Sequence, residues 1–221
     1  RGLGDVYKRQ LEIEALRLEP GESVFLRGPS GCGKTTLLGI IAGILPFDQG
    51  QVSLLGRSVQ QMSRRERDRV RADHLGYIFQ MFNLIPYLSV LENITLPCQI
   101  SKSRQARLKS SLDAEAKELA EALGIADTLS RSHVGELSVG QQQRVAVARA
   151  LIGSPDIIIA DEPTSALDTD HRERFVEVLK ESAIDRGSAV LFVSHDKGLT
   201  SHFGRSVSLP EINKAAGGRN V

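Results

Sequence analysis

The sequence feature that most constrains the fold is a match to the phosphate-loop pattern G-x-x-x-x-G-K-S/T at residues 28–35. An apolar strand is expected just before it, at Val24–Arg27, and a helix after it, from Lys34 to about Gly43. The glycines let successive backbone N–H groups point at phosphate oxygens, Lys34 reaches the β- and γ-phosphates, and Thr35 faces Mg²⁺. Strand, loop and helix in this order predict a nucleotide-binding α/β domain.

An acidic pair after a second apolar strand is the expected counterpart of this loop. The isoleucine-rich strand Asp156–Asp161 delivers Asp161 and Glu162 at its carboxyl end. In phosphoryl-transfer sites one group of this kind serves the metal and another orients the attacking nucleophile. We therefore predict Asp161 on the metal side and Glu162 at the attacking water.

A third segment, Leu137–Arg144, lies between the loop and the acidic strand and reads L-S-V-G-Q-Q-Q-R. With this segment between them, the motifs resemble those of the ATP-binding cassette (ABC) family, and we call Leu137–Arg144 the signature segment. It departs from the usual L-S-G-G-Q at Val139. The resemblance implies that phosphate is contacted by the Ser138 hydroxyl and the Gly140 backbone, so the Val139 side chain is expected to point away from phosphate.

Further residues of this family's motifs occur in the same order. Gln80 ends the strand-like stretch 75–79, where the family places a glutamine that senses metal and water. Ser165 and Asp168 bound a segment resembling the family's D-loop, and His195 matches its switch histidine. Taken alone, Gln80 is an ordinary surface glutamine and His195 a capping or half-buried histidine. The shared order of five motifs makes coincidence negligible.

The resemblance implies an ATPase that uses ATP and Mg²⁺ and works as a head-to-tail homodimer. Each ATP would lie between the phosphate loop of one chain and the signature segment of the other, whose helix near Gln141 aims its positive N-terminus at the γ-phosphate. The expected catalytic residues are Glu162, which orients or deprotonates water, His195, which bonds the γ-phosphate, Gln80 and Lys34. ATP is expected to contact Gly28, Pro29, Ser30, Gly31, Cys32, Gly33, Lys34, Thr35 and Thr36 of one chain and Ser138, Gly140 and Gln141 of the second copy. The expected metal ligands are Thr35, Gln80 and Asp161. The expected D-loop residues are Ser165 and Asp168.

The segment after Gln80 is rich in large apolar groups beside a moving hinge, which suggests a docking surface. In ABC transporters a cytoplasmic helix of the membrane permease binds there. The sequence F-N-L-x-P at residues 82–86 resembles that of the lipoprotein-releasing and macrolide-export branch. Phe82, Leu84 and Tyr87 are the predicted docking residues. The alternative is that Phe82, Leu84 and Leu88 are local core.

Other cassette functions stay open at this point. A cassette ATPase of the cell-division type also docks on a membrane partner, and the ATPase of a small-solute importer has the same motifs. A translation factor usually needs two cassettes in one chain, and a DNA-repair ATPase usually needs a coiled-coil or zinc insertion. A P-loop kinase does not explain the signature segment. The sequence does not name the cargo.

The expected fold is a P-loop NTPase sandwich with a mainly parallel core sheet, an N-terminal antiparallel β part and an inserted helical subdomain. At 221 residues the chain fits one large domain. We expect the cassette at 11–210, its helical subdomain at about 83–155 and a tail at 211–221. A strand is expected near Leu11–Leu18, and one helix is indicated by Leu108, Leu112, Ala116, Leu119 and Leu123.

The first ten residues are set apart from the fold. Residues 4–10 read like translated sequencing-adapter DNA, so we treat 1–10 as a non-native N-terminus. The family usually stacks adenine on an aromatic residue upstream of the phosphate loop. In residues 11–27 the candidate is Phe25, which lies in a strand and is predicted to be core, so the adenine platform is expected to be missing.

Composition narrows the partners and the location. A net charge of +1, with acidic residues interleaved in the run Arg64–Arg71, argues against a nucleic-acid partner. The two cysteines, Cys32 and Cys98, lack disulfide or metal-ligand spacing. Without an apolar run long enough for a membrane span or a signal peptide, we expect a cytoplasmic protein, peripheral on the cytoplasmic face of the cell membrane.

Overall fold

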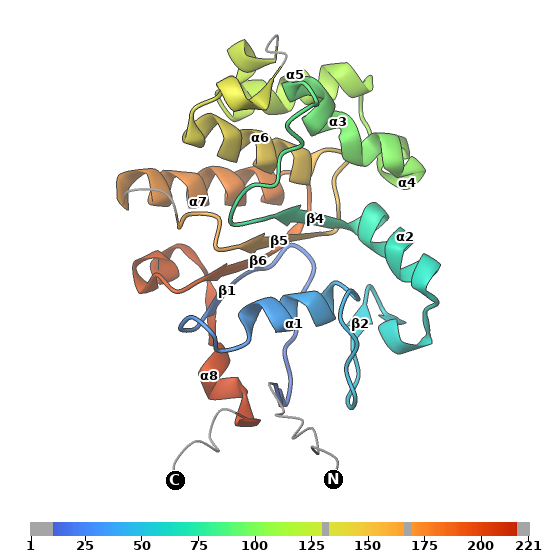
Figure 1. Cartoon of the computed structure of the whole chain (residues 1–221), viewed down its shortest axis with the longest axis vertical. Coiled ribbons are helices and arrows are strands. Elements are labelled where there is room, and N and C mark those ends of the chain that lie inside the picture. The colour runs from blue at the N-terminus through green and yellow to red at the C-terminus, as the bar shows by residue number, and fades with distance from the viewer. Residues whose placement is uncertain (1–10, 130–132, 166–168, 216–221) are drawn as a thin grey trace, which may run out of the picture.

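The centre of the computed structural model, which describes residues 11–129, 133–165 and 169–215, is a five-stranded sheet (Figure 1). All of its neighbouring strands run parallel, in the order β4-β5-β6-β1-β7. Its strands are β1 (Ser23–Arg27), β4 (Leu75–Ile78), β5 (Ile157–Asp161), β6 (Ala189–Ser194) and β7 (Arg205–Ser208). The expected parallel core sheet is confirmed.

Helices cover both faces of this sheet. Figure 1 shows α1 (Lys34–Ile41) on one face and α6 (Val139–Leu151) with α7 (Thr169–Ile184) on the other. Because side chains alternate along a strand, β1 supplies both layers: Val24 and Leu26 pack with the α1 side, whereas Phe25 joins the core under α6 and α7. Burial on both faces explains why the strands are nearly continuous apolar runs.

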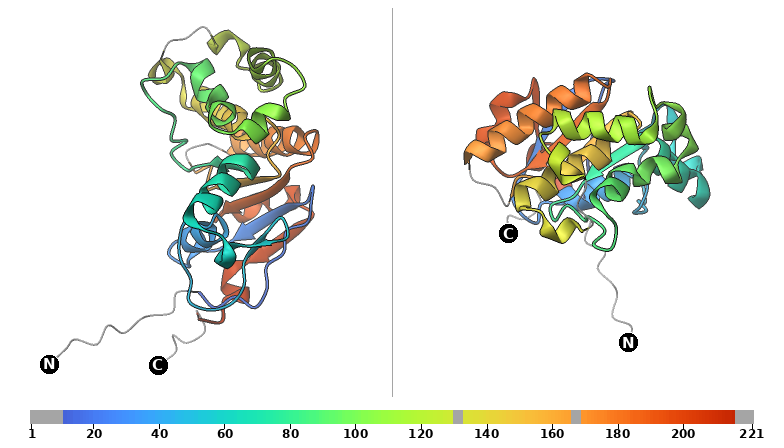
Figure 2. Two further views of the ribbon diagram at one scale, coloured as in Figure 1. Left: turned by 90° about the vertical axis from the view of Figure 1, so that its right-hand side faces the viewer. Right: turned by 90° about the horizontal axis from the view of Figure 1, so that it is seen from above.

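The inserted helical part gathers beyond one face of the sheet (Figures 1 and 2). It contains α3 (Val90–Ile100), α4 (Lys102–Ala106) and α5 (Leu112–Ala122), and α3 and α5 pack against α6. The helix predicted from Leu108 instead begins at Leu112, because the Ser111 hydroxyl caps it by accepting a hydrogen bond from the Ala114 N–H. Leu108 still packs against the core from outside the helix.

A smaller β part lies beside α1. It is the antiparallel pair β2 (Ser53–Leu54) and β3 (Arg57–Ser58), followed by α2 (Arg64–His74). A reciprocal cap between Ser63 and Glu66 starts α2, whose charged residues are mostly exposed, as expected of a solvated face. The remaining short elements are η1 (Val59–Gln61), η2 (Ala126–Thr128), η3 (Val134–Glu136), η4 (Lys197–His202) and α8 (Leu209–Ile212).

The prediction of a strand near Leu11–Leu18 is wrong. Its alternating apolar residues do pack against the α1 side of the core, but only a single antiparallel bridge forms, between Ile13 and Asn213. Among the described residues, no neighbouring strand offers this segment a ladder. Within the same residues, no helix has the length and apolar character to cross a membrane.

Candidate active site

The phosphate loop folds as its glycines require. Gly31 and Gly33 have φ values of 77° and 103°, the left-handed region that favours glycine. A Cβ on Gly28 would lie 2.6 Å from the Cys32 sulfur, so the half-buried thiol packs against the start of the loop. The Lys34 Nζ donates to the Gly28 and Pro29 carbonyls at 2.7 and 3.1 Å. The lysine is therefore held over its own loop.

The acidic pair lies directly opposite this lysine. Glu162 follows β5 with a φ of 49°, a costly conformation for a residue with a side chain, and its N–H donates to the Val193 carbonyl at 2.9 Å. One Glu162 carboxylate oxygen is 3.3 Å from Lys34 Nζ, and the other is 2.8 Å from His195 Nδ1. The structure thus brings three predicted catalytic residues, from three separate elements, into one chain of contacts.

Asp161 occupies the last position of β5 and is half-buried. Burial, followed by the neighbouring Glu162 carboxylate, raises the pKa of Asp161, while Lys34 and a hydrogen bond from Tyr77 oppose that rise. Gln80 is exposed just beyond β4, the strand paired with β5, so both side chains belong to the same carboxyl edge of the sheet. Thr35, the third predicted metal residue, is exposed in the first turn of α1, and all three side chains carry oxygen atoms, the donor type that Mg²⁺ prefers.

The signature segment forms the N-terminus of α6. The Ser138 hydroxyl accepts from the Gln141 N–H at 3.3 Å and the Gln141 side chain accepts from the Ser138 N–H at 3.0 Å, a reciprocal cap. Val139 fits the first helical position with its side chain 51% exposed. Because α6 and α1 cover opposite faces of the sheet, the segment belongs to a different layer from the phosphate loop (Figure 1).

The signature helix is tied to the acidic loop of its own chain. The Gln143 side chain is buried and donates to the Pro163 carbonyl, one residue after Glu162, at 2.8 Å. Exposed Ser165 donates its N–H to the Glu162 carbonyl at 3.2 Å. Asp168, the second predicted D-loop residue, lies outside the described residues.

The predicted docking residues divide into two groups. Phe82 is only 7% exposed and belongs to the main core, and Leu84 packs against the same core. Phe82 is therefore an internal side chain and not the surface group that was predicted, whereas Leu84 is half-buried, and docking on it stays a prediction. Tyr87 is 79% exposed and keeps the expected accessibility. Phe25 is fully buried beside Phe192, as predicted, and offers no face to adenine.

Three residues around β4 and the turn after it were not identified from the sequence. Arg149 donates to the Phe82 and Asn83 carbonyls at 2.5 and 2.7 Å and so holds a turn in which both residues have positive φ. Arg104 is buried and donates to the Leu75 carbonyl at 2.6 Å. Tyr77 bonds Asp161. The alternation of side chains along β4 places Tyr77 on one face of the sheet and could have pointed to it. The two arginines bond backbone carbonyls, and no sequence pattern marks such contacts.

Sequence comparison agrees with this geometry. Residues 11–165 match the ABC transporter family. The chain belongs to the ABC transporter family. An uncharacterized ABC transporter ATP-binding protein of Mycobacterium tuberculosis is 39% identical over 217 residues, 96% of this chain and 86% of that protein. The lipoprotein-releasing system ATP-binding protein LolD of a Shewanella strain is 37% identical over 207 residues, 93% of this chain and 87% of that one.

A solved cassette has the same fold. A dimeric ATP-binding cassette in a post-hydrolysis state, bound to ADP and Pi, superimposes with a TM-score of 0.76 at 33% identity, covering 91% of this chain and 84% of that one. The present cassette is accordingly an ATP-binding subunit of an ABC transporter that hydrolyses ATP.

Proposed function

We propose that this cassette drives a membrane permease of the lipoprotein-release or macrolide-export type from the cytoplasmic face of the cell membrane. The observation that carries the proposal is the contact chain from Lys34 through Glu162 to His195 at the phosphate loop. The similarity to a lipoprotein-releasing system ATP-binding protein, over 93% of this chain, supports the branch.

The chemistry follows from these side chains. Lys34 turns from its own loop carbonyls to the β- and γ-phosphates, and Glu162 accepts a proton from the attacking water or orients it. His195 contacts the Glu162 carboxylate through Nδ1. In the proposed site it would also bond the γ-phosphate. Thr35, Gln80 and Asp161 would hold Mg²⁺, which neutralises phosphate charge when bound.

The second half of each ATP site is proposed to come from another copy. The signature segment and the phosphate loop lie in different layers of one chain, and a similar solved cassette is dimeric. In a head-to-tail dimer the capped N-terminus of α6, with Ser138, Gly140 and Gln141, would face the γ-phosphate held by the other chain's Lys34. ATP then bridges the two copies, and hydrolysis removes the bridge.

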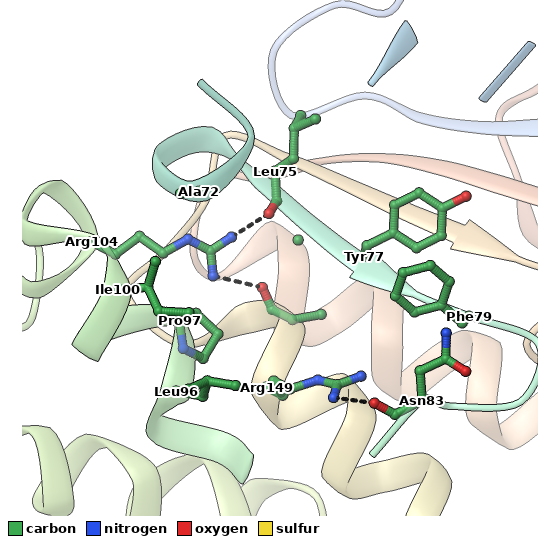
Figure 3. Close-up of a pocket in the computed structure, with 12 residues that line it drawn as sticks. Ala72, Leu75, Tyr77, Phe79, Asn83, Leu96, Pro97, Ile100, Arg104 and Arg149 are labelled. Atoms are coloured by element: carbon green, nitrogen blue, oxygen red, sulfur yellow. Dashed lines mark hydrogen bonds between the residues drawn. The ribbon is translucent and has the colours of Figure 1, made fainter. Parts of the chain in front are cut away.

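A cavity beside Gln80 supports permease docking. Figure 3 shows Leu96, Pro97 and Ile100 of α3 around a cavity of about 230 Å³ that also meets Phe79 and Asn83, on either side of Gln80 in sequence. The lining of the cavity is mostly apolar, and Ile100 on its rim is 67% exposed. An apolar helix of the permease that enters here would lie against the turn holding Gln80.

Co-purification with the membrane subunit encoded by the neighbouring open reading frame tests this proposal. Ile100→Asp should abolish co-purification while leaving the melting temperature and ATP binding unchanged, because the lost contacts are intermolecular. Leu84→Ser is the matched internal control and should lower the melting temperature, since Leu84 packs on the core. Retained co-purification of Ile100→Asp would overturn docking at this cavity. A permease with a large extracytoplasmic domain supports the branch, whereas a solute-binding protein encoded beside it supports import.

A further inference from the structure

We propose that Arg172 is a positioning residue for the switch histidine, His195. Its ion pair with Asp196 holds the backbone from which His195 reaches Glu162. The inference rests on the proposed function, in which His195 and Glu162 serve ATP hydrolysis. Arg172 itself belongs to none of the motifs described above.

His195 lies just beyond the end of β6, next to the end of β5. These two strands pair in parallel, with Asp161 opposite Val193. Glu162 therefore leaves β5 close to the point where His195 leaves β6, and the Glu162 N–H donates to the Val193 carbonyl. The His195 side chain is 59% exposed, so packing restrains it little. Its direction toward Glu162 depends on the backbone that carries it.

Asp196, the next residue, is held by three hydrogen bonds. Its N–H donates to the hydroxyl of buried Ser194 at 3.1 Å, and its Oδ1 accepts from the Gly198 N–H at 2.9 Å, at the start of η4. Its Oδ2 accepts from the Arg172 guanidinium at 2.9 Å. Because Ser194 ends β6 on one side and Asp196 is fixed on the other, the backbone at His195 is held between the two.

Arg172 brings in a second element, the first turn of α7, which packs against β6 and η4. A cation at this end of a helix opposes the helix dipole, so Arg172 is stabilised by Asp196 and not by its own helix. The hydrogen bond from Gly198, and after it those contributed by Arg172, lower the pKa of Asp196, which keeps the carboxylate charged. The ion pair thus joins the segment of His195 to the helix that follows the D-loop in sequence.

The energetics of this pair favour direction over stability. Both side chains are 30% exposed, and ion pairs with this exposure contribute little to the free energy of unfolding. Loss of Arg172 should therefore release the segment of His195 without unfolding the protein. A misplaced catalytic group, in contrast, is costly for the rate.

NMR spectra of the histidine imidazoles test the role directly. The chain has five histidines, so His195→Gln identifies the His195 signal by its disappearance. In Arg172→Gln we expect the His195 signal to shift or broaden as its contact with Glu162 loosens. The signal of His74, which precedes β4 at the amino edge of the sheet, should stay in place. Arg172→Lys keeps the charge and should hold the His195 signal near its wild-type position.

ATPase kinetics supply the second measurement. Arg172→Gln should lower kcat by about 10- to 100-fold, with an unchanged KM for ATP, because the loss falls on the transition state. The melting temperature should change by less than about 4 °C. Arg205→Gln is the matched control, because it breaks an ion pair of 2.8 Å with Glu22 at the amino edge of the sheet, and it should change neither kcat nor the His195 signal.

An unmoved His195 signal in Arg172→Gln would overturn the proposal. So would a large fall in melting temperature with changes at all the histidine signals, because that pattern reports a merely structural ion pair. If His195→Gln itself hydrolyses ATP at the wild-type rate, it is the role of His195 in the proposed function that fails. The NMR signal alone then decides whether Arg172 positions the side chain.

Discussion

Exchange of Glu162 for glutamine should both stop hydrolysis and tighten ATP binding. Without nucleotide, Lys34 is held by the Glu162 carboxylate at 3.3 Å, and the two side chains are only 9% and 13% exposed. At an effective dielectric constant of about 20, unit charges at this separation attract by about 5 kcal/mol. Lys34 must give up this partner to reach phosphate, so the pair opposes ATP binding.

Only part of that energy should appear in the measured affinity. Lys34 keeps its bonds to the Gly28 and Pro29 carbonyls in the Glu162→Gln variant, and desolvation of both charges offsets most of the attraction. We expect about 1–2 kcal/mol to remain, which corresponds to about 5- to 30-fold tighter ATP binding. Loss of the base should lower turnover by about 100- to 10,000-fold.

The assay combines equilibrium ATP binding, phosphate release and gel filtration. Glu162→Asp keeps the charge with a shorter side chain, so it separates loss of charge from loss of geometry and should not gain the same affinity. Lys34→Ala should lose binding. A Glu162→Gln protein with wild-type affinity would refute the argument that Glu162 restrains Lys34. If that protein stayed monomeric at saturating ATP, the head-to-tail site would be contradicted.

Two further variants probe the loop and the hinge. Cys32→Ser should change turnover by less than about tenfold, which corresponds to roughly 1.4 kcal/mol of barrier. A bulky maleimide on the wild-type thiol should inhibit turnover, and bound ATP should protect against it. A larger loss of turnover in Cys32→Ser would show that the thiol has a catalytic role. Asn93→Ala should lower stability by about 1–3 kcal/mol, because the fully buried Asn93 amide bonds the backbone of Ile85 in both directions, and a melting curve identical to wild type would contradict this.

The parallel core was predictable because it is buried on both faces. The strand expected at Asp156–Asp161 is observed at Ile157–Asp161, and the one expected at Val24–Arg27 is observed at Ser23–Arg27. Runs of apolar residues between turn signals leave few alternatives for such strands. The glycines of the phosphate loop were equally informative, since Gly31 and Gly33 adopt the backbone conformation that the motif requires.

Other features depend on partners that are distant in sequence. The alternating pattern of residues 11–18 indicates a half-buried segment, but the bridge at Ile13 depends on Asn213. Phe82 turns inward because Arg149, on α6, holds its carbonyl. An apolar side chain beside a loop has the same local pattern whether it faces solvent or core. Of the three predicted docking residues, Tyr87 is the fully exposed one because of tertiary contacts that the local sequence does not indicate.

The Gln143 hydrogen bond to the Pro163 carbonyl has a consequence for cooperativity. In the proposed dimer each chain presents its acidic loop to one ATP and its signature helix to the other. The 2.8 Å bond joins these two segments inside a single chain, so a shift of the loop at one nucleotide displaces the helix that closes on the second. We therefore expect binding of the first ATP to change the affinity for the next, and by linkage the effect is reciprocal. Gln143→Ala should bring the Hill coefficient for ATP toward one.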